Sequence, residues 1–159
     1  MKMLLVHPEK CTGCRICELV CAYKHYKVNN PKKAAIRVTQ LFPKPAANVP
    51  IVCRQCKVAP CIERCAELKF NALYKNDSGV TLVDAEKCVG DFACAEACPF
   101  AAVYIHPDLK TPIICDLCGG DPECVKHCPT NAIEFTTPIA AHQTRRTEQA
   151  TKMASRKKK

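Results

Sequence analysis

Fifteen cysteines carry most of the chemistry that this 159-residue sequence offers. They fall into four groups of four positions, and every group ends with two positions that are four residues apart. One position is an aspartate, Asp91, which stands where the spacing of its group calls for a cysteine. The groups are Cys11, Cys14, Cys17 and Cys21; Cys53, Cys56, Cys61 and Cys65; Cys88, Asp91, Cys94 and Cys98; and Cys115, Cys118, Cys124 and Cys128. Residues four apart share one face of a helix, so each group should end on a short helix.

The spacing within the first group is typical of iron–sulfur clusters. Thiolate sulfur is a soft ligand that suits iron, and three cysteines on a tight loop can reach three irons of one cluster. A run of C-x2-C-x2-C-x3-C followed by proline is the pattern of bacterial two-cluster ferredoxins, in which the fourth cysteine binds the neighbouring cluster. Pro99 and Pro129 directly follow the last cysteines of the third and fourth groups. The four groups therefore predict four [4Fe-4S] clusters.

An internal repeat supports Asp91 as a ligand. Residues 6–14 match residues 83–91, which aligns Gly90 with Gly13 and Asp91 with Cys14. Three outcomes follow for this site: the carboxylate holds the fourth iron, that iron is lost to leave a [3Fe-4S] cluster, or the site carries no cluster. Oxygen is a harder ligand than thiolate, so an iron bound to Asp91 should exchange more readily than the others.

Two other uses of cysteine fit less well. A disulfide framework is typical of secreted proteins, but the sequence opens without an apolar signal segment and has an odd number of cysteines. Zinc sites use C-x2-C pairs, so the second and fourth groups, taken alone, leave open a zinc module that binds nucleic acid through a basic tail. Of the formal charge of +9, residues 142–159 supply +6. Clusters of about −2 each would make the rest mildly acidic, so we expect no nucleic-acid partner.

The pattern of apolar residues predicts a small α+β protein. Short β-prone runs bounded by turn residues are 4–6, 72–74, 80–83, 102–106 and 133–135. Short helices are expected at about 17–26, 61–66, 94–98 and 122–128, where the paired cysteines need one helical turn. Residues 31–47 are predicted to form a connecting arm with an edge strand, and residues 138–159 a polar, basic tail. No run of eighteen apolar residues exists, so no membrane span is expected.

Residues 3–135 resemble the iron–sulfur subunits of the dimethyl-sulfoxide-reductase family, which accompany molybdenum and tungsten bis-pterin oxidoreductases. Within that family, residues 6–18 and 115–129 are similar to the small electron-transfer subunits beside tungsten aldehyde oxidoreductases. The resemblance implies two pseudo-symmetric dicluster ferredoxin modules, one built from residues 1–30 and 105–137 and one from residues 48–104. It also implies an electron-transfer subunit with no catalytic residue of its own.

The resemblance further implies how the four groups combine, which the residues alone leave open. The first group would pair with the fourth and the second with the third. The implied ligand sets are set A, Cys11, Cys14, Cys17 and Cys128; set B, Cys115, Cys118, Cys124 and Cys21; set C, Cys53, Cys56, Cys61 and Cys98; and set D, Cys88, Asp91, Cys94 and Cys65.

The expected partner is a tungsten or molybdenum catalytic subunit at one end of the cluster chain. At the other end we expect a ferredoxin, a flavin subunit or another copy of this chain, in an oxygen-poor cytoplasm. Two alternatives stay open: a subunit of a hydrogenase or carbon monoxide dehydrogenase, and a free polyferredoxin. His127, beside Cys128, is either a hydrogen-bond donor to a cluster sulfur or an ordinary exposed helical histidine.

Overall fold

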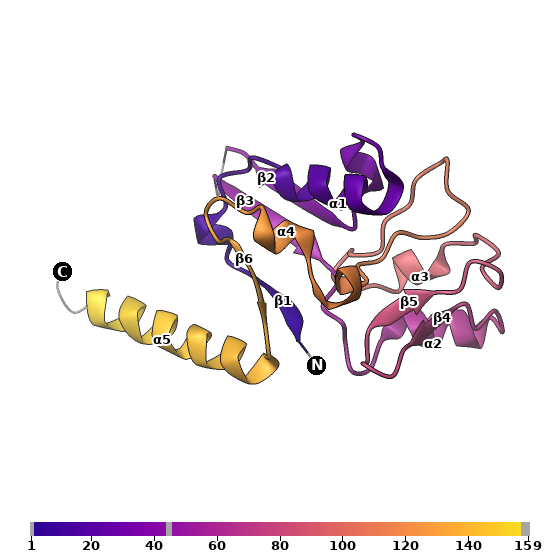
Figure 1. Cartoon of the computed structure of the whole chain (residues 1–159). Helices are drawn as coiled ribbons and strands as arrows, with labels where there is room; N and C mark the ends of the chain where they lie inside the picture. The colour runs from indigo at the N-terminus through magenta and orange to yellow at the C-terminus, as the bar shows by residue number, and fades with distance from the viewer. Residues whose placement is uncertain (1, 44–45, 157–159) are drawn as a thin grey trace.

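The computed structural model describes residues 2–43 and 46–156 and shows a small protein of mixed helix and strand (Figure 1). The described chain forms three two-stranded antiparallel sheets: β1 with β6, β2 with β3, and β4 with β5. The strands are β1 (Met3–Val6), β2 (Ile36–Leu41), β3 (Ala47–Val52), β4 (Leu73–Lys75), β5 (Thr81–Val83) and β6 (Ile133–Thr136). The helices are α1 (Ile16–Tyr26), α2 (Pro60–Glu67), α3 (Ala93–Glu96), α4 (Glu123–Lys126) and α5 (Pro138–Arg156).

One sheet joins segments from the two ends of the chain. β1 and β6 pair with Leu4 opposite Phe135 and Leu5 opposite Glu134, and α1 packs against α4 beside them (Figure 1). Leu4 and Ile133 are buried in a core that also contains Leu117 and several cysteines. The first and fourth cysteine groups are therefore brought into one half of the molecule, although about a hundred residues of sequence separate them.

The middle of the chain forms a second half with its own core. α2 packs against α3, and β4 pairs with β5 through the register Leu73–Val83 and Tyr74–Leu82. The buried residues of this core are Ala59, Cys61, Cys65, Ala72, Leu73, Cys94 and Val103. This core is small, and cysteines make up almost half of it.

The segment predicted as a connecting arm, residues 31–47, contributes more to the packing than an arm would. β2 and β3 form a hairpin in which Val38 lies opposite Pro50. A proline in a strand is tolerated because each strand of a two-stranded sheet has an edge that needs no partner. Ile36 and Val38 are buried in the first core, and the buried Glu18 accepts a hydrogen bond from the Val38 amide at 2.6 Å. This hydrogen bond connects the hairpin to α1.

A buried glutamine connects the two halves. The Gln55 side chain donates to the carbonyl oxygen of Cys115 at 2.6 Å and accepts from the amide of Thr81 at 2.8 Å. Gln55 is only 2 % exposed, and a buried amide side chain with both ends paired holds its neighbours in a fixed geometry. The predicted strand 102–106 is reduced to one bridge between Tyr104 and Ile113, because prolines at 107 and 112 limit further pairing.

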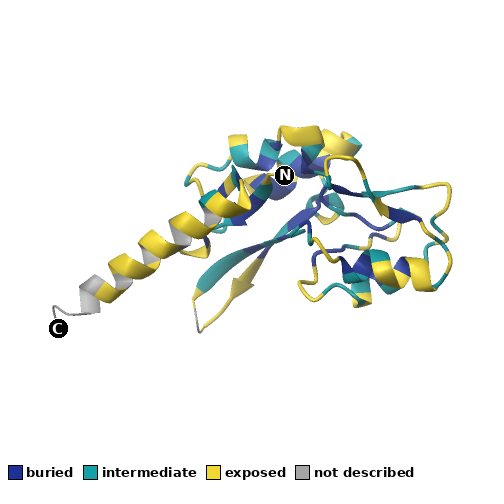
Figure 2. Cartoon of the chain, turned by 90° about the horizontal axis from the view of Figure 1, so that it is seen from below, coloured by how far each residue is buried: buried dark blue, intermediate teal, exposed yellow. Residues whose placement is uncertain are grey.

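The basic tail differs from the prediction, because its described part is a 19-residue helix, α5. Pro138 begins the helix, and the Thr137 hydroxyl accepts from the Ala140 amide at 3.3 Å, which caps the helix start. Figures 1 and 2 show α5 extending away from the body, with its described residues largely exposed. Residues 157–159 of the predicted tail lie outside the described residues. Among the residues that the structure describes, no helix has the length and apolar character needed to cross a bilayer.

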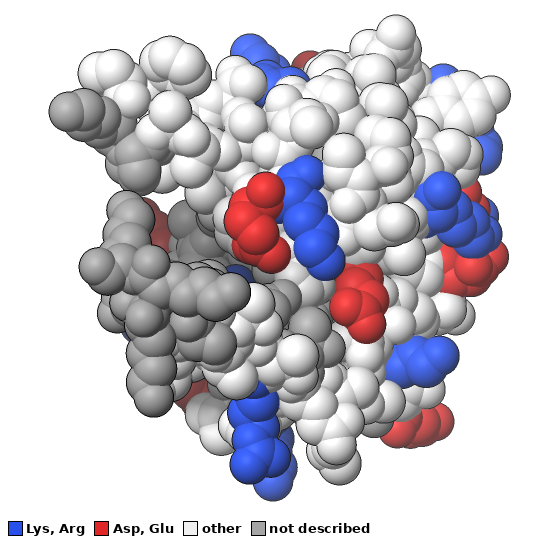
Figure 3. Space-filling view, turned by 90° about the vertical axis from the view of Figure 1, so that its left-hand side faces the viewer, with Lys and Arg blue, Asp and Glu red and all other residues white. Residues whose placement is uncertain are grey.

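Charged side chains of both signs are mixed on the face drawn in Figure 3. Described ion pairs include Lys33 with Asp108 at 3.0 Å, Arg64 with Glu67 at 3.1 Å, and Lys126 with Asp121. Such surface pairs contribute little to stability, but they show that many of the basic residues of the body have acidic neighbours.

Candidate iron–sulfur cluster sites

The backbone repeats itself around the first and third groups. Gly13 and Gly90 have φ of 76° and 78°, a region that favours glycine. Arg15 and Phe92, two residues later in each loop, have the same φ of 59° and ψ of 13°. Cys14 and Asp91 lie between these matched residues, so the two loops present them from the same backbone conformation. The alignment inferred from the sequence repeat therefore holds in the fold.

The residues of set A line one small cavity. Cys11, Cys14, Cys17 and Cys128 all face it, together with Val38, Pro50 and Ile133. Cys17 is buried, Cys11 and Cys128 are half-buried, and Cys14 is exposed. Three of these cysteines thus come from the loop before α1 and from its first turn, and the fourth comes from just after α4, more than a hundred residues later.

The residues of set D line a second small cavity. Cys65, Cys88, Asp91 and Cys94 face it, with Leu73 and Phe70 among the apolar lining. Asp91 is exposed, and its Oδ1 accepts from the amide of Ala93 at 3.4 Å. A carboxylate therefore occupies the most solvent-accessible corner of an otherwise sulfur-lined site.

For sets B and C the relation between members is electrostatic, because their thiols influence one another's pKa values. Burial, with a contribution from the nearby Cys118, raises the pKa of Cys21 to about 11. Burial also raises the pKa of Cys115 well above its usual value, with added effects from Cys124 and Cys21. In set C, burial raises the pKa of Cys53 to about 11, and Cys61, Cys56 and Cys98 contribute after it. All four members of each set therefore lie within electrostatic reach of other members.

Burial dominates the electrostatics of these sites. It raises the pKa of Cys17, Cys94 and Cys124 from 9.0 to about 12 because a thiolate without a counter-ion is poorly solvated there. Cys128 is the exception. Its pKa lies below the usual value, because amide donors from Thr130 and Ala132 outweigh the effect of burial. Without a metal, the thiols whose pKa is raised in this way are neutral near pH 7.

Cluster assembly on the cluster-free chain should therefore release a proton from each cysteine whose pKa is raised and that binds iron, and it should speed up from pH 7 to pH 9. A metal ligand must be a thiolate, and thiols with a pKa of about 11 to 12 keep their protons at pH 7. The raised pKa values also affect folding without iron. Below pH 9, the unfolded value, the buried thiols are neutral and do not oppose folding, and as the pH rises toward 12 their ionisation destabilises the iron-free chain further.

Proton release can be followed with a pH indicator in weakly buffered anaerobic solution while iron and sulfide are added. Chain with alkylated cysteines is the control and should release no protons above the reagent background. Assembly without proton release, or with a rate independent of pH, would contradict the prediction.

One backbone amide donates to the last cysteine of every group. The bonds run from Ala35 to Cys21 at 3.3 Å, from Ala72 to Cys65 at 3.3 Å, from Ala102 to Cys98 at 3.4 Å, and from Ala132 to Cys128 at 3.2 Å. Each implied set receives one of these bonds. Hydrogen bonds to cysteine sulfur are a usual feature of iron–sulfur sites, where they stabilise the thiolate and tune the potential. The donor sets thus fit iron–sulfur clusters in ligand chemistry and in the surroundings of the sulfurs.

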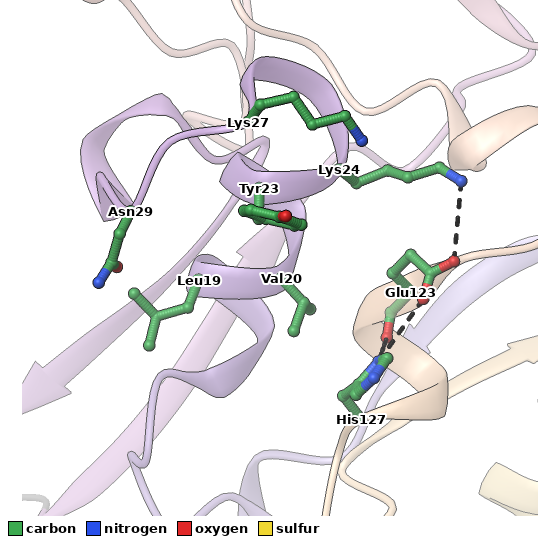
Figure 4. Close-up of a pocket in the computed structure, with 8 residues that line it drawn as sticks. All are labelled: Leu19, Val20, Tyr23, Lys24, Lys27, Asn29, Glu123 and His127. Carbon is green, nitrogen blue, oxygen red and sulfur yellow. Dashed lines mark hydrogen bonds and ion pairs between the residues drawn. The ribbon is translucent and has the colours of Figure 1, made fainter.

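Of the two alternatives for His127, the structure agrees with the ordinary exposed histidine. His127 does not point at a sulfur: its Nδ1 lies 3.0 Å from the carbonyl oxygen of Glu123 and 3.6 Å from that residue's carboxylate. Figure 4 shows His127 and Lys24 both directed at Glu123, along a groove lined by Leu19, Val20 and Tyr23. His25, which the sequence did not single out, lies 3.7 Å from the sulfur of Cys118. His25 lies on α1, one turn beyond Cys21.

Comparison with known proteins agrees with this chemistry. Residues 45–138, more than half of the chain, match the model of the 4Fe-4S dicluster domain family. A curated relative from Pyrococcus furiosus, the polyferredoxin-like subunit of an aliphatic sulfonate oxidoreductase, is 41 % identical over 97 residues, 60 % of this chain and 53 % of that protein. The electron transport protein HydN of Escherichia coli K12 is 31 % identical over 65 % of this chain and 59 % of its own length. A tetrathionate reductase subunit from Archaeoglobus fulgidus is 34 % identical over 65 % of this chain and 48 % of its own length.

A solved structure, the active-site complex BamBC of benzoyl coenzyme A reductase, contains a similar chain. The match has a TM-score of 0.51 at 30 % sequence identity and covers 86 % of this chain and 79 % of the other. The chain spans about half to three fifths of the length of these three curated relatives. The family match over residues 45–138 and the sulfur-lined sites lead to one conclusion: this chain belongs to the 4Fe-4S dicluster domain family.

Proposed function

We propose that this chain is an electron-transfer subunit of an oxidoreductase complex and that sets A to D each hold an iron–sulfur cluster. The observation that carries the proposal is the convergence of ligands from distant segments. Set A and set D each line a single cavity, and each set receives a backbone amide donor at one sulfur. Relatives described as electron-transfer or polyferredoxin-like proteins support the same function.

The proposed clusters follow one another in the order A, B, C, D. Cys124 of set B is close enough to Cys17 of set A for the two thiols to interact electrostatically. Likewise, Cys53 of set C raises the pKa of Cys115 of set B, and Cys61 of set C raises the pKa of Cys94 of set D. Iron–sulfur clusters accept and release single electrons, so this order would make a continuous path along the molecule.

The protein's part in this function is to keep the sites rigid and correctly spaced. The Gln55 side chain, fixed at both ends, holds the backbone of Cys115 in set B next to the loop that carries Cys53 of set C. The second core supports a dicluster module of residues 48–104. The first core supports a module of residues 1–30 and 105–137, although Val52 and Val80 of the other module are also buried in it. We propose that each module holds two clusters, A with B and C with D.

The proposed partner at one end is a tungsten or molybdenum catalytic subunit, with an aldehyde oxidoreductase as the specific expectation. The other end would meet a ferredoxin, a flavin subunit or another copy of this chain, in the cytoplasm. The names of the relatives support a place in a multi-subunit complex, since they include subunits of an aliphatic sulfonate oxidoreductase and of a tetrathionate reductase.

The native complex, isolated anaerobically through this chain, should contain about 15–16 irons per chain beyond those of its partner. It should also contain about one tungsten or molybdenum. Elemental analysis of one sample for iron, zinc, nickel, molybdenum and tungsten gives all of these values together.

Each other result selects a different function. Nickel in place of tungsten would indicate a hydrogenase or carbon monoxide dehydrogenase, and iron without a stoichiometric partner would indicate a free polyferredoxin. Zinc with little iron would overturn the electron-transfer proposal. The same chain expressed alone and reconstituted with iron and sulfide is the control, because its iron content is free of any contribution from a partner.

A further inference from the structure

His25 lies against a cysteine of set B. Its Nε2 is 3.7 Å from the sulfur of Cys118 and 3.5 Å from Oδ1 of Asp116. The histidine comes from the C-terminal turn of α1, and Cys118 comes from a 3₁₀ turn 93 residues later. The His25 side chain is 27 % exposed, so the ring is partly accessible to solvent.

The surroundings of Nε2 determine which ring nitrogen carries the hydrogen. Both of its neighbours are acceptors, since Asp116 is a carboxylate and Cys118, once it binds iron, is a thiolate. Asp116 is itself held in place, because its Oδ1 accepts from the amide of Cys118 at 2.8 Å. Only a protonated Nε2 makes favourable contacts with both groups. His25 therefore donates from Nε2, to the Cys118 sulfur or shared with Asp116.

This donor distinguishes set B from the other sets. All four sets receive a backbone amide at the last cysteine of a group, and set C receives another at Cys53 from Gln55 at 3.5 Å. Among the cysteines that the structure describes, Cys118 alone has a side-chain imidazole beside its sulfur. A donor to a ligand sulfur stabilises the reduced state of a cluster more than the oxidised state, because the reduced cluster carries one more negative charge.

We propose that the His25–Cys118 hydrogen bond raises the reduction potential of the cluster held by set B. His25 is thus a tuning residue that acts on the cluster through its ligand. The inference rests on the proposed function, in which Cys118 binds iron. In the order A, B, C, D, it makes the second site a better electron acceptor than it would be without the imidazole.

The test is an anaerobic redox titration of the loaded chain, followed by electron paramagnetic resonance, for the wild type and His25→Phe. Phenylalanine keeps the ring and removes both nitrogens. One midpoint potential should move to a more negative value, and the other midpoints should stay unchanged. His25→Gln keeps an N–H donor and should lie closer to the wild type. Cys118→Ser should alter the same spectral component, which assigns it to set B.

His127→Phe is the matched control, because His127 is a nearby exposed histidine whose ring contacts Glu123 and not a sulfur. It should leave every midpoint unchanged. Unchanged midpoints in fully loaded His25→Phe, or an equal shift in His127→Phe, would overturn the inference. His25→Met gives a second donor-free variant, and failure of both donor-free variants to load iron would also count against a tuning role.

Iron content, measured on the same samples, separates the two proposals. A wild-type chain that binds no iron defeats the proposed function and with it this inference. A wild-type chain with about 15–16 irons whose potentials do not depend on His25 defeats the inference alone.

Discussion

Anaerobic removal of iron should abolish the cooperative unfolding of this chain and leave it largely unfolded at 25 °C. The reason is the composition of its cores. In the second core, three of the seven buried residues are cysteines, and Leu73 and Val103 are the only large aliphatic side chains among them. Full burial of one such side chain contributes only about 1.5–3 kcal/mol. Metal binding to thiolates contributes on the order of 10 kcal/mol per site in small metal-dependent domains.

The effect should reach both halves of the molecule. The first core is larger, but Cys17, Cys21, Cys115 and Cys124 are among its buried members. The β1–β6 sheet does little by itself, because a two-stranded sheet is marginally stable in water. Loss of the metal would remove the link between segments that lie about a hundred residues apart. Folding would then have to overcome the entropy cost of bringing these segments together without that link.

Circular dichroism during thermal unfolding, before and after treatment with a strong iron chelator, measures this effect. The same chelator saturated with iron is the control and should leave the transition unchanged. A cooperative transition at the original midpoint in fully iron-free chain would show that the side-chain cores suffice for folding, and it would remove the proposed structural role of the clusters.

The cysteine spacing accounts for much of what the sequence could predict about the fold. It located α1, α2, α3 and α4 to within a few residues, because two ligands four apart need one helical turn. The strands β1, β4, β5 and β6 followed from short β-prone runs. The β2–β3 hairpin was only half predicted, because Pro50 in β3 weakens the strand signal. The helix α5 was not predicted, because the polar, basic composition of this segment is also typical of an unstructured tail, although the segment is rich in helix-forming residues.

The candidate sites, too, could be predicted only in part. The sixteen positions were visible as groups, yet their combination into sets came from a family resemblance, because spacing along the chain does not reveal which groups meet in space. The structure lines single cavities with the members of set A and of set D. The contact between His25 and Cys118 bridges 93 residues, and neither residue's local sequence carries a signal for it. Long-range contacts of this kind depend on how α1 meets the turn before α4.

The site at Asp91 should be the first to lose iron. Oxidation of the loaded wild type by a mild oxidant should release about one iron per chain and produce a [3Fe-4S] signal in electron paramagnetic resonance. Asp91 is exposed and offers an oxygen ligand, which binds cluster iron less firmly than thiolate does. The other fifteen positions are cysteines, most of them buried or half-buried, so the loss should stop at that iron.

Substitutions at Asp91 test the cause of this lability, and the matched loop at Cys14 shows why they should fold. Asp91→Cys should retain the fourth iron under the same oxidation and give no [3Fe-4S] signal, because a cysteine in this backbone conformation already occupies the first group. Asp91→Ala should hold about one iron fewer than the wild type even before oxidation. Asp77→Ala, which changes an exposed acid in the turn between β4 and β5, is the control and should behave as the wild type.

If Asp91→Ala keeps the full iron content, or if Asp91→Cys loses iron as readily as the wild type, the carboxylate is not a cluster ligand. The fourth iron of set D, if present, would then depend on another group.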